Sequence, residues 1–398
     1  MSGRPGAAAG LPLLEDLPPV AGRRVLVRVD FNVPLVRPEG DQGPAVVADD
    51  FRIRAATETL GWLVSRGASV TACTHLGRPK GHVDPLYSVA PVRARLEELA
   101  PGVELLENLR FDPGEEGCDP RFVDRLVKGF DAFVNDAFGS SHRAHASIVG
   151  PPTRLPSAAG RLLAREVEVL GGLLEGPERP FVAVAGGAKV ADKLGVLRSL
   201  LEKVDHLIVG GGMAYTFLVA QGHTVARSLV DPDSVESCKE LLDSASERLL
   251  LPSDLVALGP GGTIGRGRGG TGESAVVGLD VPDGWEGVDI GPDTAGRFAQ
   301  ALTGARTIFW NGPVGAFEDD RFSKGTRAVA EAVTDSGAWS VVGGGDTAAA
   351  LDSFGLADRV GFVSTGGGAS LELLEHGDLP GLRALREASN APGRRGSD

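Results

Sequence analysis

Cysteine is scarce in this chain: Cys73, Cys118 and Cys238 are the three cysteines among 398 residues, and they lie far apart. A disulfide framework needs paired cysteines and a zinc knuckle needs CxxC pairs, so the sequence excludes both. Long hydrophobic runs are also missing, because the longest uncharged apolar stretch, 207–220, is too short to span a bilayer and contains three glycines. The N-terminal residues do not resemble a signal peptide, since prolines and acidic residues interrupt any apolar segment. We therefore expect a cytoplasmic protein without a membrane span.

An excess of positive charge is absent too. The 40 lysine and arginine residues are outnumbered by 53 aspartate and glutamate residues, which gives a net charge of −13. Nucleic acids and anionic membrane surfaces attract basic proteins, so neither is an expected partner. Any anion bound here must be held by a local cluster of basic groups. Hydrophobic residues make up 42% of the chain, enough for a sizeable core, and 398 residues correspond to two or three domains at roughly 150 residues each.

Short β-branched runs alternate with helical stretches along most of the chain. This alternation is typical of parallel sheets with crossover helices. We predict an α/β fold with two Rossmann-like domains, each a parallel sheet flanked by helices, facing each other across a hinged cleft. A helix over 161–174 is predicted to connect them. The predicted strands are 24–29, 68–74, 103–107 and 131–135 in the first half, and 181–185, 206–209, 307–310, 340–342 and 360–363 in the second, with weaker candidates at 256 and 276–277.

Arginines recur at the ends of the predicted strands in the first half. Ligands bind beyond the carboxyl ends of the strands in open α/β sheets. Any one of these arginines is better explained by a surface ion pair. Four of them on one edge, however, predict a site for a small, multiply charged anion, which guanidinium groups bind bidentately. The residues at this edge are Asp30, Phe31 and Asn32, then His75, Leu76, Gly77 and Arg78, then Arg110 and Arg143, with Arg52 opening the first crossover helix.

Glycines follow every main strand predicted in the second half. Glycine lets backbone N–H groups approach a ligand, and helix N-termini favour phosphate. Glycines also serve in tight turns, but five such loops on one edge favour a nucleotide site. Lys189 and Lys193, four residues apart on a predicted helix, would face the phosphates, and Asp346 offers an oxygen ligand suited to Mg²⁺. The loops are 186–189, 210–212, 311–313, 343–347 and 365–368.

Other motifs are absent or misleading. The chain has no GxxxxGK[ST] sequence and therefore no P-loop. Residues 265–270 fit GxGxxG, but they lie in a glycine-rich stretch that we interpret as a flexible surface loop rather than a dinucleotide fingerprint. His142 and His145 lack a third ligand, so a metal site there is not expected.

An anion site and a nucleotide site together indicate phosphoryl transfer. Catalysis of that reaction consists mostly of positioning and of neutralising oxygen charge, which lysine, arginine, Mg²⁺ and backbone N–H groups supply. The residues by themselves leave the phosphate acceptor open.

Eight motifs, in order along the chain, resemble the phosphoglycerate kinase family. The resemblance covers about 13–385. It implies reversible phosphoryl transfer from 1,3-bisphosphoglycerate to MgADP, giving 3-phosphoglycerate and ATP in glycolysis, by a cytoplasmic monomer that uses Mg²⁺. The motifs are RVDFNVP at 28–34, HLGRP at 75–79, ENLRF at 107–111, NDAFG with HRAH at 135–145, GGAKV at 186–190, WNGP at 310–313, GGGDT at 343–347 and STGGGA at 364–369.

The resemblance also implies a division of labour. Residues 1–172 would form the 3-phosphoglycerate-binding domain, with 377–398 packing back on it, and 173–376 would form the nucleotide-binding domain. The triose site would comprise Asp30, Phe31, Asn32, Arg52, His75, Leu76, Gly77, Arg78, Arg110 and Arg143. The nucleotide site would comprise Gly187, Lys189, Lys193, Gly287, Asn311, Glu318, Gly344, Gly345, Asp346 and Thr347, with Asp346 on the magnesium side and Glu318 at the ribose. Arg52, Lys193, Gly345 and Gly368 would be catalytic.

One segment departs from the family pattern. Residues 258–273 are far richer in glycine than the family's usual acidic connection, and this puts the order of the loop in doubt. Two other functions stay open: another acyl-phosphate-forming kinase that acts on acetate or carbamate, and a nucleotide sensor without activity. A sensor predicts substitution of Arg52, Lys193 or Asp346, and none of the three is substituted.

Overall fold

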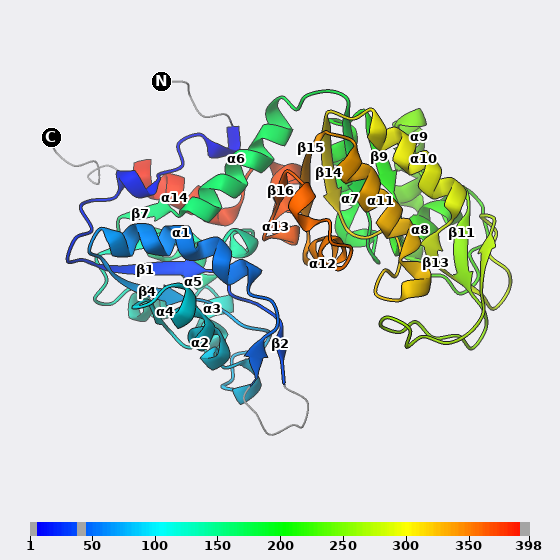
Figure 1. Cartoon of the computed structure of the whole chain (residues 1–398). Coiled ribbons are helices and arrows are strands. Elements are labelled where there is room, and N and C mark those ends of the chain that lie inside the picture. Colours follow the sequence, from blue (N-terminus) through cyan, green and yellow to red (C-terminus); the bar gives the residue numbers. More distant parts are fainter. Residues whose placement is uncertain (1–5, 38–44, 391–398) are drawn as a thin grey trace. The chain divides into compact units, whose positions relative to one another are not determined.

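The computed structural model of the chain describes residues 6–37 and 45–390. By their internal contacts the residues form two compact units, the first made of Met1–Gly172 with His376–Asp398 and the second of Leu173–Glu375. Figure 1 shows the elements of both units. Among the described residues, no helix is both long and apolar enough to cross a membrane.

The first unit is built on a parallel sheet of five strands in the order β5-β4-β1-β6-β7. If these five strands are numbered 1 to 5 along the chain, their order in the sheet is 3-2-1-4-5, the order of the first five strands in a Rossmann fold. The central strand β1 is buried over Val25–Val29, as expected for a parallel strand covered on both sides. The strands are β1 (Arg24–Val29), β4 (Ser69–Cys73), β5 (Glu104–Leu105), β6 (Ala132–Asp136) and β7 (Ser157–Ala159), and a separate hairpin joins β2 (Leu35–Val36) to β3 (Val46–Val47).

Helices cover the sheet of the first unit. Apolar residues of α1, among them Ile53, Leu60 and Leu63, pack into the same hydrophobic cluster as Val25 and Val27 of β1. Aspartates begin the short helices α3 and α4: Asp112 and Asp119 accept hydrogen bonds from backbone N–H groups of the first turn. The helices are α1 (Phe51–Ser65), α2 (Ala90–Leu99), α3 (Pro113–Glu116), α4 (Pro120–Leu126), α5 (Ala146–Val149), α6 (Arg161–Glu175) and α14 (Pro380–Asn390).

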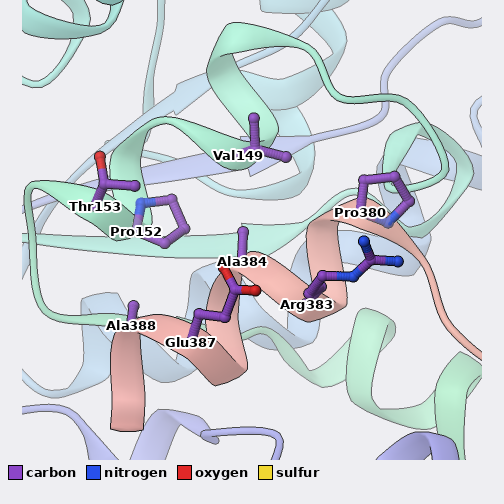
Figure 2. A pocket seen from close by; sticks show the side chains of 8 residues that line it. All are labelled: Val149, Pro152, Thr153, Pro380, Arg383, Ala384, Glu387 and Ala388. Carbon is purple, nitrogen blue, oxygen red and sulfur yellow. The ribbon is translucent and has the colours of Figure 1, made fainter. Parts of the chain in front are cut away.

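The C-terminal helix α14, red in Figure 1, packs against α5 and β7 of the first unit. Leu382 and Leu385 are fully buried there. A hollow of about 470 Å³ lies between α14 and the segment that runs from Val149, the last residue of α5, to Thr153 (Figure 2), and none of the residues lining it is a predicted site residue. The sequence prediction extended this segment to residue 398, but 391–398 lie outside the described residues.

The second unit holds a parallel sheet of six strands in the order β10-β9-β8-β14-β15-β16. Along the chain this order is 3-2-1-4-5-6, that of a doubly wound dinucleotide-type sheet. The strands are β8 (Phe181–Ala185), β9 (His206–Val209), β10 (Leu249–Leu250), β14 (Thr307–Asn311), β15 (Trp339–Gly343) and β16 (Phe362–Val363). The predicted α/β class with parallel sheets flanked by helices is therefore confirmed.

A second, antiparallel sheet completes this unit, in the order β12-β11-β13. The two weak strand candidates of the sequence analysis become β11 (Leu255–Leu258) and β12 (Ser274–Val277), whereas β13 (Glu286–Ile290) was not predicted. Two of its five residues, Gly287 and Asp289, are poor strand formers, which hid β13 from a propensity-based reading. The helices are α7 (Leu194–Leu201), α8 (Gly212–Ala220), α9 (Val235–Ala245), α10 (Pro292–Thr303), α11 (Lys324–Asp335), α12 (Gly345–Ser353) and α13 (Gly367–His376).

Candidate active site

The strand order of the first unit reverses between β1 and β6, and ligands bind at such a point. Asp30 follows β1 directly and is buried. Its Oδ1 lies 3.2 Å from Nη1 of Arg52, and its Oδ2 accepts a hydrogen bond of 3.2 Å from the hydroxyl of Ser140, which follows β6. Burial is the largest single influence and opposes ionisation, but Arg52, His75, Arg28 and the N–H of Asn32 together outweigh it and lower the pKa of Asp30 to about 2. Asp30 is therefore a fixed anion that holds Arg52 at this edge.

Gly77 ties two neighbouring strand ends together. Its N–H donates to Oδ1 of Asn32 at 2.9 Å, and its carbonyl accepts a hydrogen bond of 2.7 Å from Nη1 of Arg110. Its φ is +61°, and a Cβ would lie 2.3 Å from the ring of Tyr87. Only glycine fits both constraints. The backbone of the HLGRP motif thus orients one arginine of the cluster.

Arg28 is a site residue that the sequence analysis did not assign. It lies within β1 but is fully buried, and its Nη2 is 3.2 Å from Nδ1 of His75. Because a guanidinium can only donate, Nδ1 of His75 must accept, and the ring proton of His75 resides on Nε2. Nε of Arg28 donates to Oγ of Ser147 at 2.8 Å, and that hydroxyl in turn donates to Oε1 of Glu115 at 2.6 Å. The signal in the sequence was a charged residue inside an otherwise apolar strand.

Three histidines show how strongly positive this edge is. The pKa of His75 is well below its usual range, chiefly through burial and also through Arg28 and Arg110. Burial and Arg143 lower the pKa of His142. Burial, Arg110, Arg143 and Arg28 lower the pKa of His145 to about 4. Burial is the main cause at all three histidines, and the guanidinium groups add to it, as expected in a field that favours an anion.

The remaining predicted residues of this edge divide into two kinds. Arg78 is exposed and Arg143 is half-buried, so both guanidinium groups can reach a ligand. Phe31 and Leu76, by contrast, belong to the hydrophobic core. Their N–H groups already donate to Oγ1 of Thr74 and Oδ1 of Asn108, at 2.9 Å and 3.2 Å. These two residues shape the loops from within.

In the second unit, the strand order reverses between β8 and β14. The loops that follow these strands approach so closely that a Cβ on Gly186 would lie 2.1 Å from the carbonyl oxygen of Pro313. Gly187 donates to the same carbonyl at 3.0 Å and accepts from the N–H of Met213 in α8 at 3.0 Å. The glycines predicted here to allow ligand approach thus also allow the backbone loops to pack on one another.

Lys193 is the cation of this edge. Its Nζ donates to the carbonyl of Gly186 at 2.6 Å and to Oδ1 of Asn311 at 3.2 Å. Burial lowers the pKa of Lys193 to about 8, and the negative charges of Asp346 and Asp192 oppose that shift. The predicted pairing with Lys189 on one helix face is wrong, because Lys189 is an exposed residue of the loop and the helical segment begins only at Ala191. The glycine-rich loop extends farther than the spacing suggested.

Two helix N-termini complete the edge. Gly344, with φ +98°, precedes α12, so the backbone N–H groups of Gly345, Asp346 and Thr347 lie in its first turn, where no helix carbonyl accepts them. Gly368 lies in the first turn of α13. The hydroxyl of Thr347 accepts the N–H of Gly312 at 2.7 Å, so its side chain serves the fold.

The donor set fits Mg²⁺ held largely by a nucleotide. Among the described residues, no group of three or more His, Cys, Asp or Glu could hold a metal ion. The carboxylate of Asp346 is exposed at the start of α12. Mg²⁺ in kinase sites uses one or two carboxylates together with phosphate oxygens and water, which is compatible with a single acidic residue here.

Gly287 and Glu318 lie beside these loops rather than on them. Gly287 is on β13, where a Cβ would lie 2.6 Å from the ring of Tyr215. Glu318 is exposed in the turn after β14. Between them, Val314 accepts the N–H of Gly211 at 3.0 Å, and Ala316 donates to Val288 at 2.9 Å. The segment 314–318 therefore joins the antiparallel sheet to the glycine loops.

The first unit has an arginine-lined edge, and the second has an edge of glycine loops that carries a lysine. A doubly wound α/β protein with two such edges has the construction of a phosphotransferase. The sequence model of phosphoglycerate kinase matches residues 14–104 and 101–377. The phosphoglycerate kinase of Rubrobacter xylanophilus is 49% identical over 389 residues, 92% of this chain and 96% of the relative, and that of Salinispora tropica is 49% identical over 409 residues, 94% and 98%. The chain belongs to the phosphoglycerate kinase family.

Solved structures lead to the same family. The phosphoglycerate kinase of Coxiella burnetii superimposes with a TM-score of 0.80 at 38% identity, covering 95% of this chain and 99% of the other. The enzyme of Pyrococcus horikoshii gives a TM-score of 0.80 at 30% identity, with the same coverage of both chains.

The balance of charges around Lys193 is open to measurement. We expect its ε-carbon signal, followed by NMR on isotope-labelled protein, to titrate with a midpoint of about 8. Asp346→Asn should move the midpoint down, because Asp346 stabilises the charged form. The exposed Asp352, on the same helix, provides the control Asp352→Asn, which should leave the midpoint unchanged. An unchanged midpoint in Asp346→Asn would show that the two groups do not interact.

Proposed function

We propose that this chain catalyses the reversible transfer of a phosphoryl group from 1,3-bisphosphoglycerate to MgADP, giving 3-phosphoglycerate and ATP, as its family does in glycolysis. The observation that carries the proposal is the arginine-lined edge of the first unit. Arg52, Arg78, Arg110 and Arg143, with neutral histidines between them, suit a ligand with both a carboxylate and a phosphate.

In this proposal the first unit binds the triose. Arg78, Arg110 and Arg143 bind its anionic groups, Nε2–H of His75 donates to an oxygen, and Asp30 and Asn32 hold the surrounding loops. Arg52, held by Asp30, neutralises charge on the phosphoryl group as it transfers. Phosphoryl transfer needs such positioning and neutralisation rather than a covalent intermediate.

The second unit binds the nucleotide. Lys193 and the N-termini of α12 and α13, with Gly345 and Gly368, bind the phosphates, while Lys189, Gly187 and Asn311 line the loop beside them. Gly287 borders the base and Glu318 accepts from the ribose. Mg²⁺, held by Asp346 and the phosphates, would neutralise the charge between the phosphate groups. The predicted monomeric state, cytoplasmic location and closure of the two domains belong to the same proposal.

The choice of acceptor tests the proposed function directly. A coupled assay of ATP consumption should show turnover with 3-phosphoglycerate and none with acetate or carbamate, because only the triose offers a second anionic group to the arginines. Turnover with acetate or carbamate instead would assign the chain a different acyl-phosphate chemistry. No turnover with any acceptor would support the sensor alternative.

Arg52 should matter for rate more than for nucleotide affinity. A cation on the transferring phosphoryl group contributes ~10³–10⁵ in kcat in comparable enzymes, so we expect Arg52→Ala to lower kcat by at least ~10³-fold. Its Kd for ADP should stay within about twofold, since the ligand lies on the other unit. The control is Arg54→Ala, two residues along α1, whose exposed side chain pairs with Asp50. A near-normal kcat in Arg52→Ala would remove Arg52 from the mechanism.

Calorimetry should show that variants of the first unit affect triose binding and variants of the second unit affect nucleotide binding. Arg78→Ala should weaken 3-phosphoglycerate binding by roughly tenfold or more, because a charge-assisted hydrogen bond contributes ~1.5–3 kcal/mol. Glu318→Ala should raise the Kd for ADP and leave triose binding unchanged. Each variant is the control for the other, and the reverse pattern would exchange the two assignments.

A further inference from the structure

The glycine-rich segment that links β11 to β12 is tied together by hydrogen bonds of its own. Thr263 and Thr271 exchange two backbone hydrogen bonds of 3.0 Å, and their hydroxyls lie 2.9 Å apart. At its base, Gly259 donates to the carbonyl of Glu273 at 2.8 Å. The antiparallel strands on either side exclude the dinucleotide reading of GxGxxG, which requires a helix to follow.

Arg321 donates hydrogen bonds both to this loop and to Asp319. Its Nη1 donates to the carbonyls of Thr271 and Gly272 at 3.0 and 3.1 Å, and its Nη2 donates to that of Thr263 at 2.9 Å. Its Nε and Nη2 bind the two oxygens of Asp319 at 3.0 and 2.8 Å. All five N–H groups of the guanidinium are thereby used. Lysine has three donors and no planar fork, so it cannot make the same set.

Asp319 is the buried centre of this arrangement. Its side chain is fully buried, and its Oδ2 also accepts the N–H of Gly265 at 3.0 Å. The hydrogen bonds from Arg321 lower the pKa of Asp319 to about 2, so the pair stays charged at neutral pH. We call Asp319, Arg321 and the loop 263–272 the loop clamp.

The glycines of the loop are required by the clamp. A Cβ on Gly270 would lie 2.2 Å from both Nη2 of Arg321 and Oδ2 of Asp319. A Cβ on Gly265 would lie 2.3 Å from the backbone nitrogen of Gly270. The repeated glycines therefore reflect a backbone wrapped closely around two side chains, and this accounts for the departure from the family's usual segment.

The clamp is bonded to the residue proposed to contact the ribose. Gly267 donates to the carbonyl of Glu318 at 2.7 Å, and its own carbonyl accepts the N–H of Asp320 at 2.9 Å. These bonds enclose Asp319 on both sides, so the main chain that carries Glu318 is fixed by the loop. The side chain of Glu318 remains exposed to a ligand.

We propose that Asp319 and Arg321 are positioning residues for nucleotide binding, which act by holding the main chain of Glu318 in its ligand-binding arrangement. The inference rests on the proposed function, in which Glu318 contacts the nucleoside. A segment that is ordered before binding loses less conformational freedom when the ligand arrives, so the clamp increases affinity without touching the nucleotide.

Arg321→Gln and Arg321→Lys test the clamp by calorimetry with ADP and by steady-state kinetics. Both should raise the Kd for ADP roughly tenfold, which corresponds to about 1.4 kcal/mol. The kcat at saturating ADP and the KM for 3-phosphoglycerate should stay within about twofold, since the first unit is unaffected. Arg268→Gln is the matched control. It also removes one arginine, but the side chain of Arg268, in the same loop, is 96% exposed.

Gly267→Ala addresses the hydrogen bond to Glu318 with Arg321 in place. Gly267 has φ +58° and no neighbour within 4 Å of a Cβ, so alanine strains the backbone without a clash. We expect a smaller loss of ADP affinity, about threefold. This variant also tests the proposal if the Arg321 variants do not fold.

The double variant Glu318→Ala/Arg321→Gln separates the possible outcomes. If Arg321 acts through Glu318, the double variant should bind ADP no more weakly than Glu318→Ala alone. Additive losses of ADP affinity would overturn the positioning role. Weaker binding in Glu318→Ala with normal binding in Arg321→Gln and Gly267→Ala would refute the clamp and leave the proposed function intact. Normal binding in Glu318→Ala would refute its ribose contact in the proposed function, and the clamp with it.

Discussion

Parallel strands place all their carboxyl ends at one edge of a sheet, and both candidate sites depend on that constraint. Asp30, His75 and Ser140 lie far apart in the sequence, yet each follows a strand of the same sheet. Both sheets also reverse their strand order next to the first strand, and the loops on either side of each reversal meet there, through Asp30 and Ser140 in one unit and Gly187 and Pro313 in the other. No single segment could gather these groups.

In the proposed function the two edges bind anions by different physical means. In the first unit, guanidinium groups repel one another, and Asp30 offsets part of that repulsion with a charge that the arginines themselves keep ionised. Burial and the same guanidinium groups lower the pKa of the histidines at this edge. In the second unit the positive charge is sparser and comes from Lys193, the exposed Lys189 and the partial charges at helix N-termini. An acidic protein can thus hold polyanions without a basic surface.

Glycine serves three distinct purposes in this chain. At Gly77 it permits a positive φ against an aromatic ring; at Gly186 it lets two backbone loops pass within contact; and at Gly270 it makes room for a buried ion pair. A sequence pattern cannot distinguish these purposes, because all three require the same residue, glycine. The GxGxxG match at 265–270 has this cause.

The sequence by itself determined the α/β class, the main strands of both parallel sheets and the residues at their ends, because apolar runs and the residues that follow them are local properties. It also determined the family, since the ordered motifs record the site chemistry. Only the tertiary structure decided that Arg28 lies beneath His75, that Lys189 and Lys193 do not share a helix, and that Phe31 and Leu76 face the core. It likewise decided that Asp319 and Arg321 close around a loop some fifty residues earlier in the chain. Contacts of that kind depend on which backbone carbonyls and side chains converge after folding, and no local pattern in the chain encodes that convergence.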